Sequence, residues 1–186
     1  TEKLDGSNVA IAKVKGQPVA LVRAGYMAQS SPRKQHQIFA EWVRRRPWDN
    51  LPDGWRISGE WLYQAHGTIY DPNSPFIAFD VFDDCNKRLP HDQARALMRS
   101  CGVVGAHVIS DGPGVTIESA LEALGERGFH GAQEQVEGAV WRVETGGVFN
   151  FLAKYVRLDK IDGKHFGAGE GGGDIFLCDP LEGFDL

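Results

Sequence analysis

The sequence predicts an α+β domain with mainly antiparallel sheets. Three observations lead to this fold class: β-rich runs occupy both ends of the chain, short turn sequences join neighbouring runs, and segments with helical periodicity lie mainly in the middle. Strands that bracket a central helical insertion are typical of α+β architecture. The sequence shows neither an internal repeat nor a linker, so a single domain is expected.

The first third of the chain is predicted to form a hairpin followed by a helix. Residues 8–14 and 18–24 are rich in β-forming side chains, and Lys15-Gly16-Gln17 between them is a hairpin signal. Residues 33–46 then carry apolar side chains at helical spacing, with basic residues at the other positions. Pro47 is expected to end this helix, because its ring and missing N–H are incompatible with a helix interior.

The rest of the chain continues with strands and two further helices. The predicted strands are 55–63, 75–82, 105–110, 138–144 and 148–157, and the predicted helices are 91–100 and 116–127. Thr116 is predicted to cap the second of these helices, with Gly128 as its terminator. The stretch 167–173 is Gly-rich and is expected to be loosely ordered.

The composition fits one globular domain. The chain has 186 residues, of which 42% are hydrophobic and 24% charged, enough for a real core. No apolar run approaches the roughly 20 residues of a membrane span, and no secretory leader is visible. Cys85, Cys101 and Cys178 contain no Cys-x-x-Cys pair, so neither a disulfide framework nor a zinc site is indicated. Buried free thiols and a cytoplasmic setting are therefore expected.

The charge distribution leaves room for a nucleic-acid partner despite a net charge of −5. Acidic residues gather in 71–84, 118–144 and 170–185. The stretch 33–46 instead carries five basic side chains, namely Arg33, Lys34, Arg44, Arg45 and Arg46. A local basic face can coexist with an acidic total. This stretch is either such a face or the solvated side of a helix.

The sequence Lys3-Leu4-Asp5-Gly6 places an amine two residues before an Asp-Gly turn. A covalent nucleotidyltransferase needs a nucleophilic amine in this setting, because the glycine permits a backbone conformation closed to residues with a Cβ. The aspartate can bind a ribose or the water shell of a metal ion. Such a tetrapeptide is a weak signal alone, and its weight comes from the segments that follow it in order.

Five further segments complete a series. They are Arg23, Gly59-Glu60-Trp61, Phe76-Ile77-Ala78-Phe79-Asp80, Glu137-Gly138 and Lys154-Tyr155-Val156-Arg157. The series resembles the nucleotidyltransferase motifs of the polynucleotide ligase and mRNA capping enzyme superfamily, and it is most similar to the RNA ligases. The resemblance implies a ligase-type nucleotidyltransferase (adenylyltransferase) fold, with the nucleotide between two antiparallel sheets flanked by helices. It covers an adenylation domain over residues 1–160 and leaves a Gly-rich extension over 161–186.

Transfer of AMP from ATP needs a nucleophile, a nucleobase pocket, a metal and neutralisation of phosphate charge. Lys3 would supply the amine and form a lysyl-AMP phosphoramidate. An ordinary lysine has a pKa of about 10.4 and is protonated at neutral pH. The site must therefore favour the neutral amine, through burial or through the positive charge of Lys154 and a metal.

Three carboxylates are candidates for holding Mg²⁺ or Mn²⁺ through water: Asp5, Glu60 and Glu137. Mg²⁺ keeps most of its waters, so these side chains need only converge on its hydration shell. Glu60 lies among apolar neighbours, an expensive place for a lone carboxylate. The resemblance implies that Glu60 contacts the ribose or the metal, and the alternative is an edge-strand side chain that faces solvent.

The resemblance implies further nucleotide contacts. Phe79 would stack on adenine, although strand alternation with Ile77 and Val81 also allows plain core packing. Arg23 would bind the ribose or a phosphate, or else is a solvated strand-end residue. Glu2 would read the adenine amino group through its main chain, and Gly6 would let the backbone approach the nucleotide.

Lys154 would grip the α-phosphate from a strand. The family often shows Lys-x-Lys here, but this chain has Val156 at the second position, and Arg157 would point to the opposite face. Either a bulge brings Arg157 inward or one cation suffices. His66 and Tyr70 have either a role near the nucleotide or the 5′-phosphate, or a structural hydrogen bond.

The predicted function is that of an ATP-dependent RNA ligase that passes AMP from Lys3 to a 5′-phosphate RNA end and joins this end to a 3′-hydroxyl. DNA nick sealing or GTP-dependent capping on the same fold is one alternative. A non-catalytic nucleotide-binding or RNA-binding module is the other. Family members usually carry residues before the nucleophile and a domain after the last motif, so the chain is expected to act as an adenylyltransferase domain or a minimal enzyme.

Overall fold

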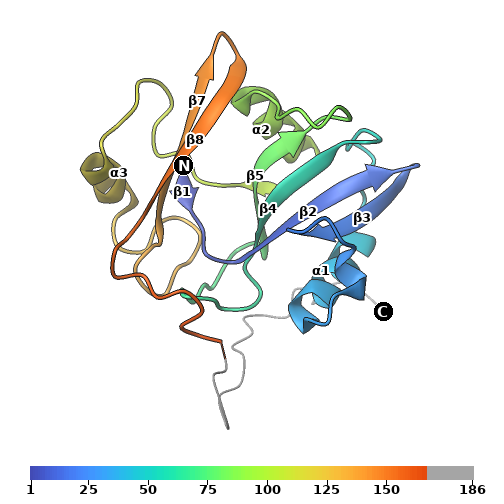
Figure 1. Cartoon of the computed structure of the whole chain (residues 1–186), viewed down its shortest axis with the longest axis horizontal. Helices are drawn as coiled ribbons and strands as arrows, with labels where there is room; N and C mark the ends of the chain where they lie inside the picture. The colour runs from blue at the N-terminus through green and yellow to red at the C-terminus, as the bar shows by residue number, and fades with distance from the viewer. Residues whose placement is uncertain (167–186) are drawn as a thin grey trace.

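The computed structural model describes residues 1–166 and shows an α+β fold of two sheets and three α-helices (Figure 1). The strands are β1 (Glu2–Lys3), β2 (Ser7–Val14), β3 (Gln17–Val22), β4 (Arg56–Trp61), β5 (Phe76–Phe82), β6 (Val104–Gly105), β7 (Gly138–Thr145) and β8 (Val148–Val156). The helices are α1 (Lys34–Arg44), α2 (His91–Ser100) and α3 (Ile117–Leu124), with a short 3-10 turn over Ala28–Ser30. The predicted fold class is confirmed.

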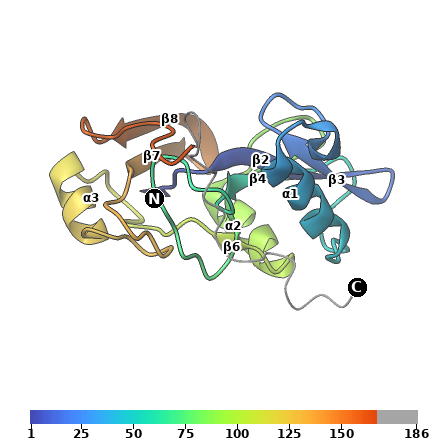
Figure 2. The same cartoon turned by 90° about the horizontal axis from the view of Figure 1, so that it is seen from below.

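The two sheets differ in size. One has five strands in the order β3-β2-β4-β5-β6, and the other has three in the order β1-β7-β8. Every pairing is antiparallel except that of β5 with β6, which α2 connects as a parallel crossover. In the view from below, β7, β8 and α3 lie on one side of the molecule and β2, β3 and α1 on the other (Figure 2).

The larger core packs α1 against the five-stranded sheet. Phe39 and Trp42 of α1 are buried against Trp61 and Phe76 of β4 and β5, and the Phe39 and Trp61 rings lie 5.1 Å apart. The aromatic pairs add geometric preference to the burial of apolar area. Burial of each such side chain stabilises the fold by roughly 1.5–3 kcal/mol.

A smaller core joins the two sheets. Leu4, Leu62 and Ile77 pack together with Ala139 of β7. Ala120 and Leu124 of α3 cover the other side of this cluster.

One buried ion pair also bridges the sheets. Arg142 of β7 donates to Asp80 of β5, and it donates as well to Glu144 and to the Leu89 carbonyl. Arg88 contacts the same aspartate at 3.0 Å. These contacts hold β7 of the smaller sheet against β5 of the larger one.

Most element boundaries agree with the prediction, and three differences have clear physical causes. The helix α3 ends before Gly125, not at Gly128, because Gly125 is the first glycine after it with a left-handed φ of 63°. The strand predicted at 105–110 is limited to Val104–Gly105, since the carbonyl of His107 accepts a hydrogen bond from Glu2 and the segment leaves β5. The strand β1 was not predicted, because a run of two residues is too short to show the alternation of a strand.

Other predictions concern the cap, the thiols and the chain end. The Thr116 hydroxyl accepts from the Ser119 amide at 3.2 Å, which confirms the predicted cap. Cys85 is exposed and Cys101 half-buried, so the expectation of buried thiols is wrong for Cys85, which lies in a turn. Cys178 and the Gly-rich stretch 167–173 lie outside the described residues. No helix within residues 1–166 is long and apolar enough to cross a membrane.

Candidate active site

The Lys3 side chain is held where the two sheets meet. Lys3 pairs in register with Gly138, which places it beside Glu137. Its amine donates to Glu137 Oε2 at 2.5 Å, with the lysine side chain 19% exposed and the glutamate 6% exposed. Only glycine fits at 138, since its φ is 156° and a Cβ there would lie 2.0 Å from the Tyr155 carbonyl oxygen. The Glu-Gly sequence therefore sets how closely Glu137 approaches Lys3.

Asp5 is fixed by contacts from three segments. Its Oδ2 accepts from the Gly67 amide at 2.7 Å and from the amine of Lys160. Its own amide donates to the buried Tyr70 hydroxyl at 3.1 Å. Tyr70 is thus bound to the backbone of the Lys-x-Asp-Gly segment. This is the structural hydrogen bond that was one of the two predicted alternatives for Tyr70.

Lys160 is a functional candidate that sequence reasoning missed. Its side chain is 3% exposed and reaches both Asp5 and the Thr68 hydroxyl, the latter at 3.2 Å. The turn at Arg157 brings it back to the site, because the Lys160 amide donates to the Arg157 carbonyl. Its distance in sequence from Lys154 hides it from a search for Lys-x-Lys.

The carboxylates around Lys3 carry raised pKa values. Burial raises the pKa of Glu60 to about 8, and the charge of Lys3 and a hydrogen bond from Asn8 offset only part of this. Burial also raises the pKa of Glu137, against the opposing effect of Lys3. Glu60 Oε2 is buried without a hydrogen-bond partner among residues 1–166. A buried carboxyl oxygen of this kind is suited to a ligand hydroxyl or a cation.

A set of three carboxylates could hold a divalent cation. Asp5, Glu137 and Asp162 place oxygens within 4.8 Å of one another. Oxygen ligands from carboxylates are those that Mg²⁺ prefers. Asp162 follows Lys160 in the same turn and was not predicted, and Glu60 is not part of this set.

Phe79 lies at a β-bulge beside the site. Ser58 pairs with Asp80 and Gly59 with Ala78, so Phe79 is the extra residue on β5. The predicted alternation is confirmed for Ile77 and Phe79, which both face the space between the sheets, where Ile77 packs in the smaller core and the half-buried Phe79 faces a cavity. It is wrong for Val81, which lies after the bulge and packs in the larger core.

This cavity, which we call the base cavity, has a volume of about 170 Å³ between the two sheets. Lys3 and Glu60 lie on one side of it. Its apolar lining includes Phe79, Met98 and Leu152. Such an apolar slot with a few polar groups is typical of a nucleobase site.

Arg23 lies in a hollow beside the base cavity, not in it. This hollow also contains Asn8 and Arg88 and shares Phe79 and Asp80 with the base cavity. Arg23 is exposed and has no hydrogen-bond partner among residues 1–166. Its charge is available to a ligand that extends past Phe79.

Lys154 and Arg157 have different surroundings. Lys154 pairs with Val140, and Leu152 with Arg142, so Lys154 lies on the face of β8 that borders the base cavity, where it is exposed. Arg157 instead donates to the carbonyl of Val136 at 2.6 Å and to Gln135. No bulge brings Arg157 inward, and Lys160 is the second cation near the site.

Glu2 and Gly6 have structural contacts in addition to their predicted roles. The Glu2 side chain accepts from the Phe129 amide at 3.0 Å, and burial raises its pKa to about 7. The chain bends at Gly6, but Gly6 does not have a left-handed φ, so the expected backbone conformation closed to other residues is wrong. It is needed because a Cβ there would lie 2.6 Å from the Trp61 carbonyl oxygen.

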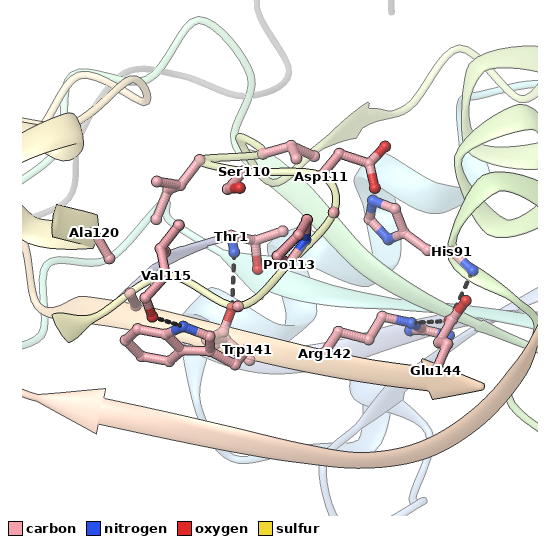
Figure 3. A pocket seen from close by; sticks show the side chains of 16 residues that line it. Thr1, His91, Ser110, Asp111, Pro113, Val115, Ala120, Trp141, Arg142 and Glu144 are labelled. Carbon is pink, nitrogen blue, oxygen red and sulfur yellow. Dashed lines mark hydrogen bonds and ion pairs between the residues drawn. The ribbon is translucent and has the colours of Figure 1, made fainter.

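Figure 3 shows a second hollow, of about 270 Å³, along the other side of β7. The loop over residues 108–115 forms one wall, and the Trp141 indole donates to the Val115 carbonyl at 2.9 Å. His91 and Arg142 line both this hollow and the base cavity. Acidic and basic side chains alternate around it, so its charge favours no particular ligand.

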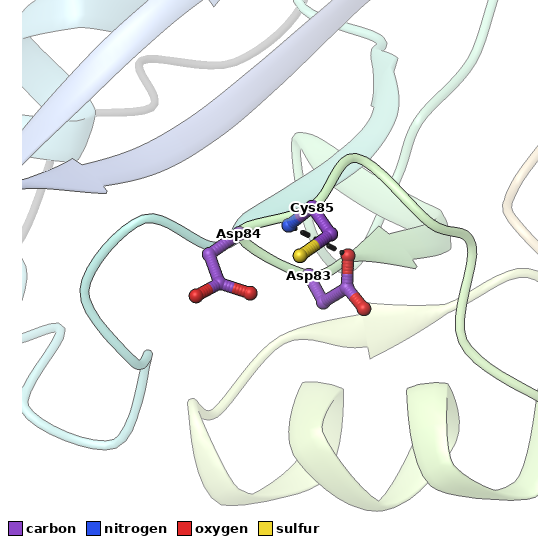
Figure 4. A group of neighbouring side chains, drawn as sticks. All are labelled: Asp83, Asp84 and Cys85. Carbon is purple, nitrogen blue, oxygen red and sulfur yellow. Dashed lines mark hydrogen bonds between the residues drawn. The ribbon is translucent and has the colours of Figure 1, made fainter.

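A separate group of possible ligands lies in the turn after β5, where Asp83, Asp84 and Cys85 are neighbours (Figure 4). The Asp83 carboxylate accepts from the amides of Cys85 and Lys87, at 3.0 and 2.8 Å. These hydrogen bonds give the Asp83 carboxylate a structural role, which is to stabilise a tight turn.

The family model for RNA ligase matches residues 1–156. The chain belongs to the RNA ligase family. Among solved structures, it is similar to an archaeal ATP-dependent RNA ligase in form 1, with 26% identity, a TM-score of 0.50, and coverage of 83% of this chain and 41% of that one. Form 2 of an archaeal ATP-dependent RNA ligase shows 28% identity and a TM-score of 0.36 over 57% of this chain and 29% of the other.

The form 1 structure supports the assignment of the fold. The chain has the nucleotidyltransferase fold of the ATP-dependent RNA ligases, and it spans less than half the length of either structure. No curated protein matches it. In this RNA ligase domain, Lys3, Glu60 and Phe79 line one cavity. Glu137 contacts the Lys3 amine, and Lys154 lies on the face of β8 that borders the cavity.

Proposed function

We propose that this member of the RNA ligase family transfers AMP from ATP to the Nζ atom of Lys3. The observation that carries the proposal is the contact of 2.5 Å between Lys3 and the buried Glu137, at the rim of a cavity whose size and lining suit a nucleobase. A nucleotide-binding module would have no chemical need for an amine paired in this way beside the base cavity.

The chemistry follows from this placement. The Lys3 amine attacks the α-phosphorus of ATP and forms a P–N bond. The bond between this phosphorus and the bridging oxygen breaks, and pyrophosphate leaves with the electron pair. The amine loses its proton to Glu137, the carboxylate that it contacts at 2.5 Å.

The residues present fit a divalent cation. Asp5, Glu137 and Asp162 would hold Mg²⁺ or Mn²⁺, and Asp5 Oδ1 has no hydrogen bond within the described chain. A bound cation would neutralise phosphate charge, which is the main need of phosphoryl transfer. Lys154 and Lys160 would add fixed positive charge on either side of Lys3.

The later steps would use RNA. AMP passes from Lys3 to a 5′-phosphate end, and a 3′-hydroxyl then displaces AMP to form the phosphodiester. Membership of the RNA ligase family supports RNA over DNA as the substrate, and the archaeal ATP-dependent neighbours support ATP over GTP.

Covalent labelling tests the proposal. The protein is incubated with ATP or GTP labelled at the α-phosphate, with and without Mg²⁺, and then denatured. We expect acid-labile label on the protein from ATP only, and transfer of this label to 5′-phosphate RNA in preference to DNA. Label from GTP alone would indicate a capping activity, and no covalent label with either nucleotide would contradict the proposal.

A further inference from the structure

A basic cluster lies next to the Lys3 site, at the start of α1. Arg33 precedes the helix, His36 is in its first turn, and His66 is in the loop after β4. Burial lowers the pKa of both histidines, and the charge of Arg33 lowers each further. The three side chains therefore lie close enough for their charges to interact.

Hydrogen bonds connect this cluster to the Lys-x-Asp-Gly segment. His66 Nε2 lies 3.3 Å from the Ser7 hydroxyl, which donates to Oε1 of the buried Gln35 of α1 at 2.8 Å. The charges of Asp5 and Lys160 also act on His66, in opposite directions. His66 thus lies between the α1 cluster and the groups around Lys3.

Within residues 1–166, no carboxylate pairs with the side chains of the cluster. The Arg33 guanidinium makes no hydrogen bond or ion pair with these residues, and the His36 ring bonds the Ser31 hydroxyl at 2.8 Å. The nearest carboxylate that acts on the cluster, Asp5, is already paired with Lys160. Nitrogen donors gathered without an acid are the groups that bind phosphate oxygens.

The position of the cluster, outside the base cavity, fits the phosphates of a nucleotide bound at Lys3. The base cavity contains Phe79 and Met98 but none of the three basic residues. A nucleotide with its base in this cavity and its α-phosphate at Lys3 extends its remaining phosphates away from the cavity. Asp5, which is outside the lining of this cavity, accepts from the amide of Gly67, the residue after His66, at 2.7 Å.

We propose that Arg33, His36 and His66 bind a phosphate group of the substrates, which is either the terminal pyrophosphate part of ATP or the 5′-phosphate of the RNA. This inference rests on the proposed adenylylation of Lys3. Both sources present the same chemistry, a dianionic phosphate that accepts several charge-assisted hydrogen bonds.

The test uses Arg33→Gln and His66→Gln, with Arg44→Gln as the matched control. Arg44 belongs to the same helix, is exposed and is paired with Glu41, so its replacement makes the same charge change away from the cluster. Each protein is titrated with inorganic pyrophosphate by calorimetry, which does not require catalysis. The concentration of ATP for half-maximal adenylylation and the rate of AMP transfer to 5′-phosphate RNA are then measured.

If the cluster binds ATP, we expect pyrophosphate affinity to fall and the required ATP concentration to rise by roughly tenfold in both variants, the loss of one charge-assisted hydrogen bond. Arg33→Lys should recover part of this loss. If the cluster binds RNA, adenylylation stays normal and AMP transfer to RNA falls by a similar factor. Unchanged pyrophosphate binding together with unchanged rates in both reactions would overturn the inference. A protein that binds pyrophosphate through Arg33 but acquires no covalent AMP would instead contradict only the proposed function.

Discussion

The two sheets of the domain differ in how deeply they are buried and in which candidate site residues they carry. The five-stranded sheet has its central strands buried beneath α1 and the aromatic core, and it contributes Glu60 and Phe79 to the site. The three-stranded sheet contributes Lys3 and Lys154, with Glu137 just before β7, yet most of β8 is exposed. The larger buried core thus lies on one sheet, whereas the proposed nucleophile and its carboxylate partner lie on the other or next to it. Changes at the reacting groups should therefore affect chemistry far more than folding.

The sharpest test of this division is Lys3→Ala. We expect complete loss of covalent AMP with little change in thermal stability, because Lys3 supplies the one amine within residues 1–166 that donates to Glu137. Lys87→Ala, which removes an exposed lysine from the turn after β5, is the control for loss of one positive charge. Acid-labile label on the Lys3→Ala protein would exclude Lys3 as the nucleophile.

Removal of a carboxylate from either sheet should have the next largest effect. Glu137→Ala and Glu60→Ala are each expected to slow adenylylation by roughly a hundredfold or more, because this chemistry depends on positioned charge. Single-turnover labelling measures the rate, and Glu122→Ala on the exposed side of α3 is the control. A variant with a near-normal rate would remove its residue from the site.

Replacement of one phenylalanine on each sheet should lower the unfolding free energy by very different amounts. Phe76→Ala removes a fully buried ring from the five-stranded sheet and should cost about 3–5 kcal/mol of unfolding free energy. Phe151→Ala on β8, where the side chain is 54% exposed, should change it by less than about 0.5 kcal/mol. Denaturant unfolding measures both values. Similar losses in the two variants would contradict the division.

Phe79 should affect nucleotide binding more than stability. Because this ring faces the base cavity, Phe79→Ala should raise the ATP concentration needed for half-maximal labelling by roughly tenfold, a typical value for lost base stacking. Phe79→Trp should restore most of the affinity. If Phe79→Ala behaved like a core variant, with lost stability and normal ATP dependence, the ring would be a packing residue.

The smallest predicted effect is a dependence of stability on pH. Glu2 and Glu60 have pKa values of about 7 and about 8 in the folded chain, above their ordinary value of 4.5, because burial disfavours the charged form. A carboxyl group whose pKa is higher in the folded chain than in the unfolded chain stabilises the fold at pH values below its unfolded pKa. This stabilisation is lost as the pH rises towards the pKa of the group in the folded chain. We expect the Tm of the ligand-free protein to fall by roughly 2–4 °C between pH 5 and pH 8.5. Glu60→Gln should flatten this slope, and a Tm that rises over the same range would contradict the assignment.

Much of the fold was predictable because its patterns are local. The α1 and α2 helices, the β2–β3 hairpin and the Thr116 cap each follow from periodicity or capping within a few residues. Convergence of Lys3, Glu60 and Glu137 was predicted only through the resemblance to ligases. The roles of the individual site residues stay predictions until the variants are measured.

The features that were missed depend on long-range geometry. Lys160 and Asp162 reach the site only because the chain turns back after β8. The face of Val81, opposite to that of Phe79, depends on a register shift between β4 and β5, which alternation along one strand cannot reveal. Arg157 was ambiguous because its partners, Gln135 and Val136, lie in an irregular segment.

The ion pair between Arg142 and Asp80 limits how the two sheets can move. It links β7 to β5 directly beside the residue that faces the base cavity, and breaking it would leave a buried charge without its partner. At this edge the sheets behave as one rigid frame, so a nucleotide cannot enter by spreading them there. On the other side of the site, the chain after β8 is joined to the loop after β4 by the contacts of Lys160 with Asp5 and Thr68 and by the hydrogen bond from the His165 amide to the His66 carbonyl. The base cavity is therefore expected to keep its shape between the free and the nucleotide-bound protein, so that a nucleotide enters a preformed site.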